Sequence, residues 1–308
     1  MKDIIIVGGG PAGLTAGLYA RRYNLDTLLI EAMLLGGQAA IAHNVENYPG
    51  YSKGVSGQYL IDQMEEQCAN FDLEILHEPV KAIFPNGRYF EVLTESDTKI
   101  ATKALIYAAG ATYRQLQVKG ENELIGHGVS YCATCDGAFF KGKNIIVVGG
   151  GNTAICDALY LANLANKVTV VHRREQFRAA PVLMDRIRLL DNVEIITDTV
   201  VTEIVGSGNV EAVKVKNKKT GSESEINVDG VFVAIGQVPN SDCLRDLVEI
   251  DAAGYIKTDE DMMTSCPGIF AAGDVRQKTL RQIVTAASDG AIAAHCANEW
   301  IISNFGQD

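Results

Sequence analysis

A short, continuous apolar run occurs twice along the chain, each time directly before a cluster of glycines. Residues 4–7 are followed by three glycines, and residues 145–148 are followed by three more. Unbroken apolar runs of this length are typical of parallel strands that are buried on both faces. Each run leads through its glycines into a predicted helix, the first of which begins near Ala12. The pattern therefore predicts two strand–loop–helix units.

The first glycine loop, at 8–13, has the spacing of a dinucleotide-binding turn. Gly8 permits a tight turn, Gly10 lets the backbone approach a pyrophosphate, and Gly13 allows the helix to pack closely on the strand. Free N–H groups at the start of the helix favour phosphate binding. Residues 27–30 predict the next strand, and the acid at its end is placed to accept hydrogen bonds from ribose hydroxyls. The candidate nucleotide-binding residues of this unit are Gly8, Gly10, Pro11, Ala12, Gly13 and Glu31.

The second glycine loop repeats the first at a constant offset of 141 residues. The match extends without a gap into the predicted helix, where 158–160 align with 17–19. One long-period repeat of this kind indicates duplication of a fold unit and not a solenoid of short repeats. The corresponding candidates in the second unit are Gly149, Gly151, Asn152, Thr153 and Ala154.

Basic residues replace the acid at the end of the second strand in the repeated unit. Where the first unit has Glu31, the second has His172. The residues that follow include Arg173, Arg174 and Arg178. Losing the acid and gaining guanidinium groups turns a site for a ribose 2′-hydroxyl into one for a 2′-phosphate. A solvated basic patch is the alternative interpretation, but the position in the repeat favours NADP over NAD.

Composition and charge set the broad class of the protein. The 308 residues suggest about two domains, and 47% hydrophobic residues can fill two cores. The formal charge of −11 argues against nucleic acid and anionic membranes as partners. No apolar run approaches the ~20 residues that cross a bilayer, and the first residues predict a strand where a signal peptide would have a basic and then apolar stretch. We therefore expect a cytoplasmic protein.

Two of the seven cysteines, Cys132 and Cys135, form the CxxC pair of the chain. A structural zinc site would need a second pair or suitably spaced histidines, so we expect no metal. A lone CxxC in a reducing compartment is typically catalytic, because its sulfurs are close enough to form and break a disulfide. Asp136 follows directly, and its charge would disfavour a neighbouring thiolate. Proton exchange with the dithiol is therefore its predicted role, with helix capping as the alternative.

With these motifs the chain resembles a low-molecular-weight, bacterial-type thioredoxin reductase over essentially its full length. The resemblance is carried by GGGPAG (8–13), GGQ (36–38), ENYPG (46–50), CATCD (132–136), GGGNTA (149–154), HRREQFR (172–178), VAIGQ (233–237), AAGD (271–274) and RQ (281–282). It implies FAD in the first unit, with Asp274 at the ribityl chain or pyrophosphate and Gln282 at the polar edge of the flavin ring. Further implied cofactor-binding residues are Gly37, Gln38, Asn47, Gly236, Gly273 and Arg281.

The duplicated unit and the resemblance together predict an α/β fold of two Rossmann-like, three-layer domains, the second inserted into the first. The FAD-binding domain comprises 1–112 and 241–308, and residues 113–240 form the NADPH-binding domain that carries the CxxC pair. Each domain is expected to have a central parallel sheet with helices on one face and a smaller antiparallel sheet on the other. Residues 217–221 predict a hairpin turn.

The resemblance implies an NADPH-dependent thioredoxin-disulfide reductase that forms a homodimer. Electrons would pass from NADPH through FAD to the disulfide. Cys135 would then contact the flavin, and Cys132 would attack the disulfide of thioredoxin or a thioredoxin-like protein. The alternatives are ferredoxin or another donor in place of NADPH, a small-molecule dithiol oxidase, the reductase component of a peroxidase system, and a flavin-binding redox sensor.

Overall fold

A computed structural model describes residues 1–42 and 44–306 and divides the chain into two compact units. The first unit comprises Met1–Thr112 and Val238–Asp308, and the second comprises Tyr113–Gln237. The second division falls after Gln237, slightly before the position at 240 expected from the sequence. At the two crossings, β7 (Ala111–Tyr113) pairs with β16 (Gln237–Pro239) in a two-stranded sheet, so each division lies within a strand.

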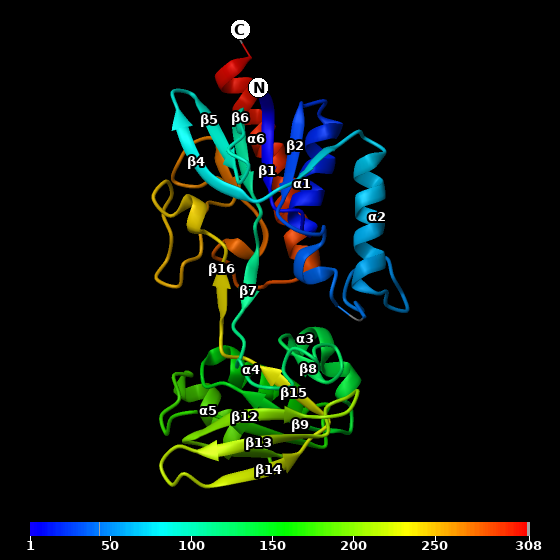
Figure 1. The fold of residues 1–308 in the computed structure, drawn as a ribbon, viewed down its shortest axis with the longest axis vertical. Coiled ribbons are helices and arrows are strands. Elements are labelled where there is room, and N and C mark those ends of the chain that lie inside the picture. The colour runs from blue at the N-terminus through cyan, green and yellow to red at the C-terminus, as the bar shows by residue number, and fades with distance from the viewer. Residues whose placement is uncertain (43, 307–308) are drawn as a thin grey trace. The chain divides into compact units, whose positions relative to one another are not determined.

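The first unit is built on a seven-stranded sheet of order β3-β2-β1-β6-β5-β4, with β17 also paired to β6 (Figure 1). Its strands are β1 (Lys2–Val7), β2 (Thr27–Glu31), β3 (Glu74–His77), β4 (Val80–Asn86), β5 (Tyr89–Thr94), β6 (Lys99–Tyr107) and β17 (Ile269–Ala271). Strand β6 pairs with antiparallel β5 near its start and with parallel β17 near its end. The antiparallel strands therefore continue the parallel sheet, and the separate antiparallel sheet expected for this unit is absent from the described residues.

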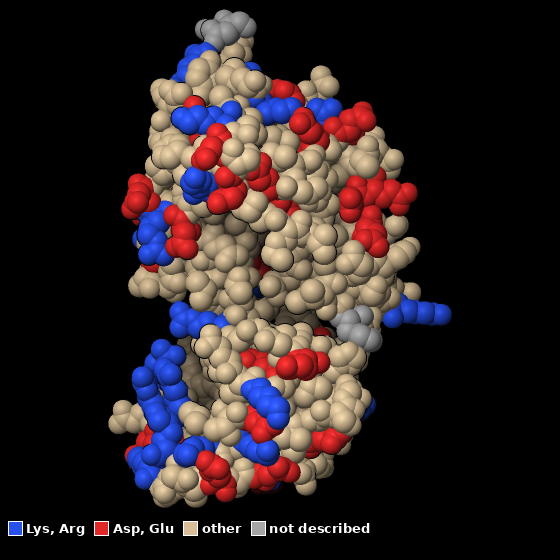
Figure 2. Space-filling model, in the orientation of Figure 1, with Lys and Arg blue, Asp and Glu red and all other residues tan. Residues whose placement is uncertain are grey.

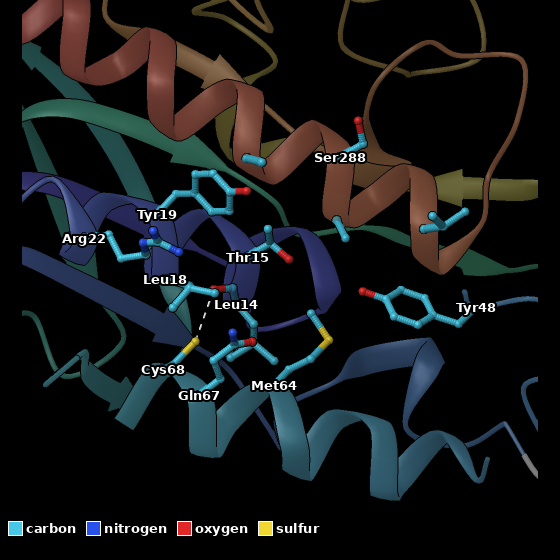
Figure 3. Close-up of a pocket in the computed structure, with 13 residues that line it drawn as sticks. Leu14, Thr15, Leu18, Tyr19, Arg22, Tyr48, Met64, Gln67, Cys68 and Ser288 are labelled. Atoms are coloured by element: carbon cyan, nitrogen blue, oxygen red, sulfur yellow. Dashed lines mark hydrogen bonds between the residues drawn. The ribbon is translucent and has the colours of Figure 1, made fainter. Parts of the chain in front are cut away.

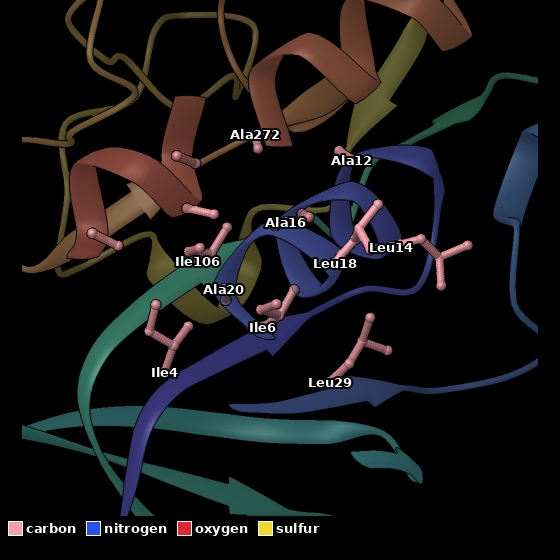
Figure 4. Packing of buried hydrophobic residues seen from close by; sticks show 14 of the residues in the cluster. Ile4, Ile6, Ala12, Leu14, Ala16, Leu18, Ala20, Leu29, Ile106 and Ala272 are labelled. Atoms are coloured by element: carbon pink, nitrogen blue, oxygen red, sulfur yellow. The ribbon is translucent and has the colours of Figure 1, made fainter. Parts of the chain in front are cut away.

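The apolar run at 4–7 is buried on both faces of this sheet. Ile4 and Ile6 join the core that contains helix residues, whereas Ile5 and Val7 belong to a second core on the opposite face. Figure 4 shows Ile4 and Ile6 beneath helix α1 (Pro11–Arg22), near Leu29 of the adjacent strand. Burying each such side chain contributes about 1.5–3 kcal/mol to folding. The unbroken hydrophobic pattern follows from this two-sided burial.

The described residues of the first unit form three α-helices, α1, α2 (Gly57–Ala69) and α6 (Ile283–Phe305). Its short 3₁₀ segments are η1 (Gly37–Ala39), η3 (Asp242–Leu244) and η4 (Gly273–Val275). Helices α1 and α6 pack directly against each other. Within residues 1–42 and 44–306, no helix combines the length and the apolar character needed to cross a membrane.

The second unit has a parallel five-stranded sheet of order β11-β10-β9-β15-β8 and a separate antiparallel sheet of order β12-β13-β14. Its strands are β8 (Val129–Ser130), β9 (Asn144–Val148), β10 (Lys167–Val171), β11 (Val193–Ile196), β12 (Thr199–Val205), β13 (Ala212–Asn217), β14 (Glu223–Asn227) and β15 (Gly230–Val233). Its helical segments are α3 (Ala133–Asp136), η2 (Gly137–Phe140), α4 (Asn152–Ala162) and α5 (Pro181–Arg188). The turn between β13 and β14 lies where the sequence predicts one, and Gly221 N donates to Asn217 O at 2.9 Å.

The two predicted strand–loop–helix units are both present. β1, α1 and β2 form the first, and β9, α4 and β10 form the second. In each unit the two strands are parallel neighbours, joined by the glycine loop and the helix. The α/β class and the duplicated Rossmann-like unit are therefore confirmed.

Glycine is required where α6 crosses the first turn of α1. A Cβ atom at Gly290 would collide with the carbonyl oxygen of Ala12, which is backbone and cannot move aside. Residues near the contact are small, among them Ala16, Ala293 and Ala294, and all three are fully buried. The close approach of the two helices therefore depends on the missing side chain.

Replacing Gly290 by Ala tests this contact. In a helix interior the change normally stabilises by roughly 0.5–1 kcal/mol, but here the added methyl group should destabilise the protein by about 1–3 kcal/mol through overpacking. The midpoint of urea unfolding, followed by circular dichroism, should fall. Glu299→Ala, at an exposed position of the same helix, is the control and should leave the midpoint nearly unchanged. A rise in the midpoint of Gly290→Ala would contradict the contact.

Candidate functional site

The first glycine loop is folded so that its centre remains open. Gly8 has a positive φ of 106°, and a Cβ atom at Gly13 would collide with the Gly8 carbonyl oxygen. By contrast, the nearest atom to a Cβ built at Gly10 is Gly36 O at 4.0 Å. Pro11 begins α1, and no side chain caps the helix N-terminus. The loop therefore offers uncapped amides beside an open space, as a pyrophosphate requires.

Glu31 lies at the end of β2 beside this loop. Its Oε2 accepts from Gly9 N at 2.5 Å, and its Oε1 accepts from Met33 N at 2.9 Å. A carboxylate has about four acceptor positions, so further hydrogen bonds to ribose hydroxyls are compatible with these two. The two backbone bonds fix the carboxylate at the edge of the glycine loop.

Two polar atoms near the end of the first unit are buried without a hydrogen-bond partner among the described residues. They are Asp274 Oδ1 and Arg281 Nε. Burial raises the pKa of Asp274, against the opposing influence of Lys278 and Arg281. Buried polar groups are almost always paired in folded proteins, so orphaned atoms of this kind indicate a missing ligand. A flavin dinucleotide, with its ribityl hydroxyls and pyrophosphate, would provide suitable partners.

The turn that carries Asp274 lies against the start of α1. A Cβ at Gly273 would come within 2.9 Å of the Ala12 Cβ, and Gly273 itself has a φ of 78°. The structure thus brings the C-terminal Gly-Asp turn to the N-terminal glycine loop, although the two are far apart in sequence. Both fit one dinucleotide.

Sequence reasoning missed the residue that holds this turn. Asp289, only 6% exposed on α6, accepts from Gly273 N at 3.0 Å. It also pairs with Arg276 at 3.1 Å and with Lys278 at 2.6 Å. A single charged residue among the small and apolar residues of 286–294 is the signal that could have revealed it.

Two other expected flavin-contacting residues lie together in the first unit. Asn47 Nδ2 donates to Gln282 Oε1 at 2.9 Å. Gln282 is also the N-cap of α6, where its side chain forms a capping box with Thr285. Gly37 and Gln38 belong to η1. The residue before η1, Gly36, donates its backbone N–H to Gly9 O at 2.8 Å. That hydrogen bond places η1 next to the first glycine loop.

The second glycine loop is likewise open, and the arginine-bearing segment is bound to it. A Cβ at Gly151 would meet nothing within 4 Å. Arg178 N donates to Gly150 O at 2.8 Å, and Ala180 N donates to Asn152 Oδ1 at 2.8 Å. Backbone hydrogen bonds therefore connect the loop that opens α4 to the segment that follows β10.

His172 packs inside this arrangement and does not project from it. Its ring lies against Gly150, where a Cβ would collide with it, and Nε2 is 3.2 Å from Gln176 O. The residue is 6% exposed, and burial lowers its pKa. Ala154 is also buried and lies close to Gly149, whereas Thr153 is exposed on the first turn of α4. His172 and Ala154 therefore shape the loop mainly by packing.

Arg173, Arg174 and Arg178 are all exposed. Among the described residues the structure records no ion pair for any of the three. Figure 2 shows basic side chains gathered at the edge of the second unit where α5 lies. Gly236, between β15 and β16, has a φ of 111°, and its carbonyl accepts from Arg114 N at 3.0 Å. Uncompensated guanidinium groups beside an open glycine loop are suited to a phosphate.

Cys132 and Cys135 form a disulfide, with a Cα–Cα distance of 5.3 Å. Cys132 is the N-cap of α3, and its carbonyl accepts from Cys135 N at 3.2 Å and Asp136 N at 3.1 Å. The Asp136 carboxylate forms no cap bond with η2; it accepts from the hydroxyl of Ser130 at 2.6 Å. The Asp136 side chain therefore does not cap η2, which was the alternative role considered for it.

A second carboxylate that the sequence analysis missed is bonded to Tyr131, the residue that precedes Cys132. Glu121 is 1% exposed and accepts from the backbone N–H groups of Leu116 at 2.8 Å and Gln117 at 2.7 Å. It also accepts from Tyr131 Oη at 2.9 Å, and the Tyr131 ring stacks on Tyr113 with centroids 5.2 Å apart. Burial, with Glu121 as neighbour, raises the pKa of Tyr131. No motif marks Glu121 in the sequence, because its role depends on backbone partners.

Comparison with known proteins places the chain in a family. The model of the pyridine nucleotide-disulphide oxidoreductases matches residues 2–290. A thioredoxin reductase from Listeria innocua is 46% identical over 97% of this chain and 93% of its own length. A crystal structure of thioredoxin reductase from Streptococcus pyogenes has a TM-score of 0.93 and 47% identity, covering 98% of this chain and 99% of that one. A bifunctional thioredoxin reductase/thioredoxin from Mycobacterium leprae is 42% identical over 99% of this chain and 67% of its own length.

The matches cover nearly the whole chain, including both glycine loops, the disulfide and the C-terminal Gly-Asp turn. The unpaired polar atoms of Asp274 and Arg281, and the glycine loops that lead into helices without a side-chain cap in both units, fit the cofactors of this family, FAD and NADPH. The disulfide in the second unit fits its redox-active dithiol. The chain therefore belongs to the pyridine nucleotide-disulphide oxidoreductase family, as a low-molecular-weight thioredoxin reductase that uses FAD and NADPH.

Proposed function

We propose that the protein passes electrons from NADPH, by way of FAD and the Cys132–Cys135 disulfide, to oxidised thioredoxin. The observation that carries the proposal is the disulfide itself. It lies in the same unit as the second glycine loop, with the Asp136 carboxylate tied beside it by Ser130. Relatives named thioredoxin reductase match over almost the whole chain, and the name of the Mycobacterium leprae relative joins a reductase to thioredoxin.

We assign FAD to the first unit. The amides of the loop at 8–13 would bind its pyrophosphate and Glu31 its ribose. Asp274 and Arg281 would use their unpaired polar atoms on the ribityl and phosphate region. The remaining residues assigned to this cofactor are Gly37, Gln38, Asn47, Gly273 and Gln282.

We assign NADPH to the second unit. The loop that opens α4 would bind its pyrophosphate, and Arg173, Arg174 and Arg178 would bind the 2′-phosphate, because they are exposed and lie on a segment hydrogen-bonded to that loop. His172 would support the segment from beneath. The remaining residues assigned to NADPH are Gly149, Gly151, Asn152, Thr153, Ala154 and Gly236.

Held by the residues assigned above, FAD would supply the two-electron chemistry that links NADPH to the disulfide. The protein itself must then position the two sulfurs and supply the two protons that reduction of the disulfide requires. Breaking the Cys132–Cys135 bond with one electron pair and two protons gives two thiols. Cys132, as thiolate, attacks the thioredoxin disulfide and forms a mixed disulfide, releasing one thioredoxin sulfur as a thiolate. Cys135 then attacks the Cys132 sulfur, which re-forms the Cys132–Cys135 disulfide and releases reduced thioredoxin. Asp136 takes up and returns the proton at the dithiol.

We also propose a cytoplasmic location for the protein. The remaining cysteines, Cys68, Cys156, Cys243, Cys266 and Cys296, are free thiols. One redox-active pair beside several free thiols suits a reducing compartment. Burial raises the pKa of Cys68 to about 12, which keeps this thiol protonated and inert.

We further propose that the protein is a homodimer and that a groove on the first unit is part of the interface. The groove has a volume of about 400 Å³ and lies between α1, α2 and α6 (Figure 3). Apolar Leu14, Leu18 and Met64 line it, with Arg22 among its polar residues. Tyr19 and Val284 also line the groove and are exposed, and exposed large apolar side chains that lie together are commonly buried by association.

The dithiol assignment predicts a separation of two activities. Cys132→Ser should abolish NADPH-dependent thioredoxin reduction, because the remaining thiol cannot form the required disulfide. Reduction of an artificial acceptor that takes electrons directly from flavin should continue. Cys156→Ser, at an exposed free cysteine of the same unit, is the control and should keep both activities. Thioredoxin reduction by Cys132→Ser would refute the role of the pair.

The arginine assignment predicts a change in nucleotide preference. Replacing Arg173 and Arg178 by Ala should raise the KM for NADPH far more than that for NADH. Each lost bond to a phosphate costs about 1.5–3 kcal/mol, or roughly tenfold or more. Arg188→Ala, at an exposed position at the end of α5, is the matched control. Equal effects on both nucleotides would show that these arginines do not bind the 2′-phosphate.

The groove assignment predicts a change in oligomeric state. Ser288→Arg places a second cation in the groove that already contains Arg22, so the sedimentation coefficient should fall from that of a dimer to that of a monomer. Ser303→Arg changes the same residue type at another exposed position of α6 and should leave a dimer. An undisturbed dimer in Ser288→Arg would exclude the groove from the interface.

A further inference from the structure

Ser130 forms hydrogen bonds with both Cys132 and Asp136. It ends β8, two residues before Cys132, and its side chain is 4% exposed. We propose that Ser130 is a positioning residue of the dithiol centre, whose hydroxyl holds Asp136 in its ionised form and ties it to the backbone of Cys132. The inference rests on the proposed role of Asp136 in proton exchange and extends that role to a residue that acts through it.

The hydrogen bonds around Ser130 Oγ have a definite direction. Cys132 N donates to Oγ at 3.1 Å, which uses the hydroxyl as an acceptor. The single hydroxyl proton has two acceptors within reach, Asp136 Oδ2 at 2.6 Å and Cys132 O at 3.4 Å. The carboxylate is both nearer and charged, so the proton goes to Asp136. One hydroxyl therefore connects the carboxylate to the N-terminal cysteine.

The backbone of Ser130 is fixed by its place in the parallel sheet of the second unit. Its strand pairs with β15, where Phe232 is the partner of Ser130, and β15 in turn pairs with β9. The next residue, Tyr131, is fixed by its hydrogen bond to buried Glu121. The position of the hydroxyl is thus set by the central sheet and does not depend on the state of the sulfurs. We therefore expect the hydrogen bond between Ser130 and Asp136, present here beside the disulfide, to persist when the cysteines are reduced.

A donor to a carboxylate favours its ionised form, so losing the donor raises the proton affinity of the acid. Other titratable groups lie on elements packed against α3 and must be distinguished from Asp136. Asp157 and Cys156 are on α4, and burial raises the pKa of Asp157 to about 6. Tyr131 and Glu121 lie on the strand side. Substitution of Asp136 itself identifies which limb of a pH profile belongs to it.

The experiment measures the pH dependence of kcat for NADPH-dependent reduction of a bacterial thioredoxin by FAD-loaded enzyme. The variants are Ser130→Ala, Asp136→Asn and the double variant. Ser130→Cys, with a weak thiol donor of similar size, serves if Ser130→Ala does not fold. Thr199→Val removes another buried hydroxyl of the same unit, which bonds to Thr197 O, and is the control. Flavin-dependent reduction of an artificial acceptor checks that each variant is intact.

We expect the limb that disappears in Asp136→Asn to move to higher pH by about one unit in Ser130→Ala, with the KM for thioredoxin unchanged. Thr199→Val should keep the wild-type profile. In the Asp136→Asn background, Ser130→Ala should not change the pH profile further, because the proposed shift of the profile acts through that carboxylate.

Two results would overturn the inference. One is an unmoved limb in Ser130→Ala, and the other is an equal loss of kcat with and without Asp136. Full activity of Asp136→Asn would be a different failure, since it would refute the proposed proton-transfer role of Asp136.

Discussion

Close backbone contact at the first turn of α1 is the constraint on which the structure of the first unit depends. Gly13 lies against the Gly8 carbonyl oxygen, and Gly290 of α6 lies against the carbonyl oxygen of Ala12. Gly273 approaches Ala12 from a third direction. Side chains at these positions would push the elements apart. Because they are absent, the N-terminal loop, the last helix and the turn bearing Asp274 converge on one helix end. The proposed assignment places one flavin dinucleotide there, bound by uncapped amides and by an unpaired carboxylate oxygen.

Buried carboxylates hold the segments that carry the chemistry. Asp289 binds the Gly-Asp turn of the first unit, and Glu121 binds two backbone amides and Tyr131 in the second. A buried charge is costly unless it is fully hydrogen-bonded. These acids meet that condition, with several donors each. Each one fixes a loop at a point where regular secondary structure would supply no partners. Asp136 is only half-buried and accepts from Ser130 in the dithiol region.

The duplicated unit shows how one backbone arrangement can be adapted to two nucleotides. In both copies a parallel strand leads through an open glycine loop into an uncapped helix. The copies differ at the end of the second strand. Glu31 bonds to its own glycine loop, whereas His172 packs beneath the loop and leaves the neighbouring arginines exposed. On the proposed assignment, a change of a few residues at one strand end changes the ligand without changing the fold.

The sequence by itself determined the repeated strand–loop–helix units, the α/β class, the CxxC pair and the basic replacement of Glu31. These features are local: glycine spacing, a continuous apolar run and neighbouring residues are sufficient to specify them. The sequence did not predict that β6 would join the parallel and antiparallel strands. The residues of a strand do not show which other strands will pair with it, or in which direction. The roles of Asp289, Glu121 and Ser130 were also invisible. Each depends on a donor or acceptor supplied by another segment or by the backbone, and tertiary folding alone brings those groups within hydrogen-bonding distance.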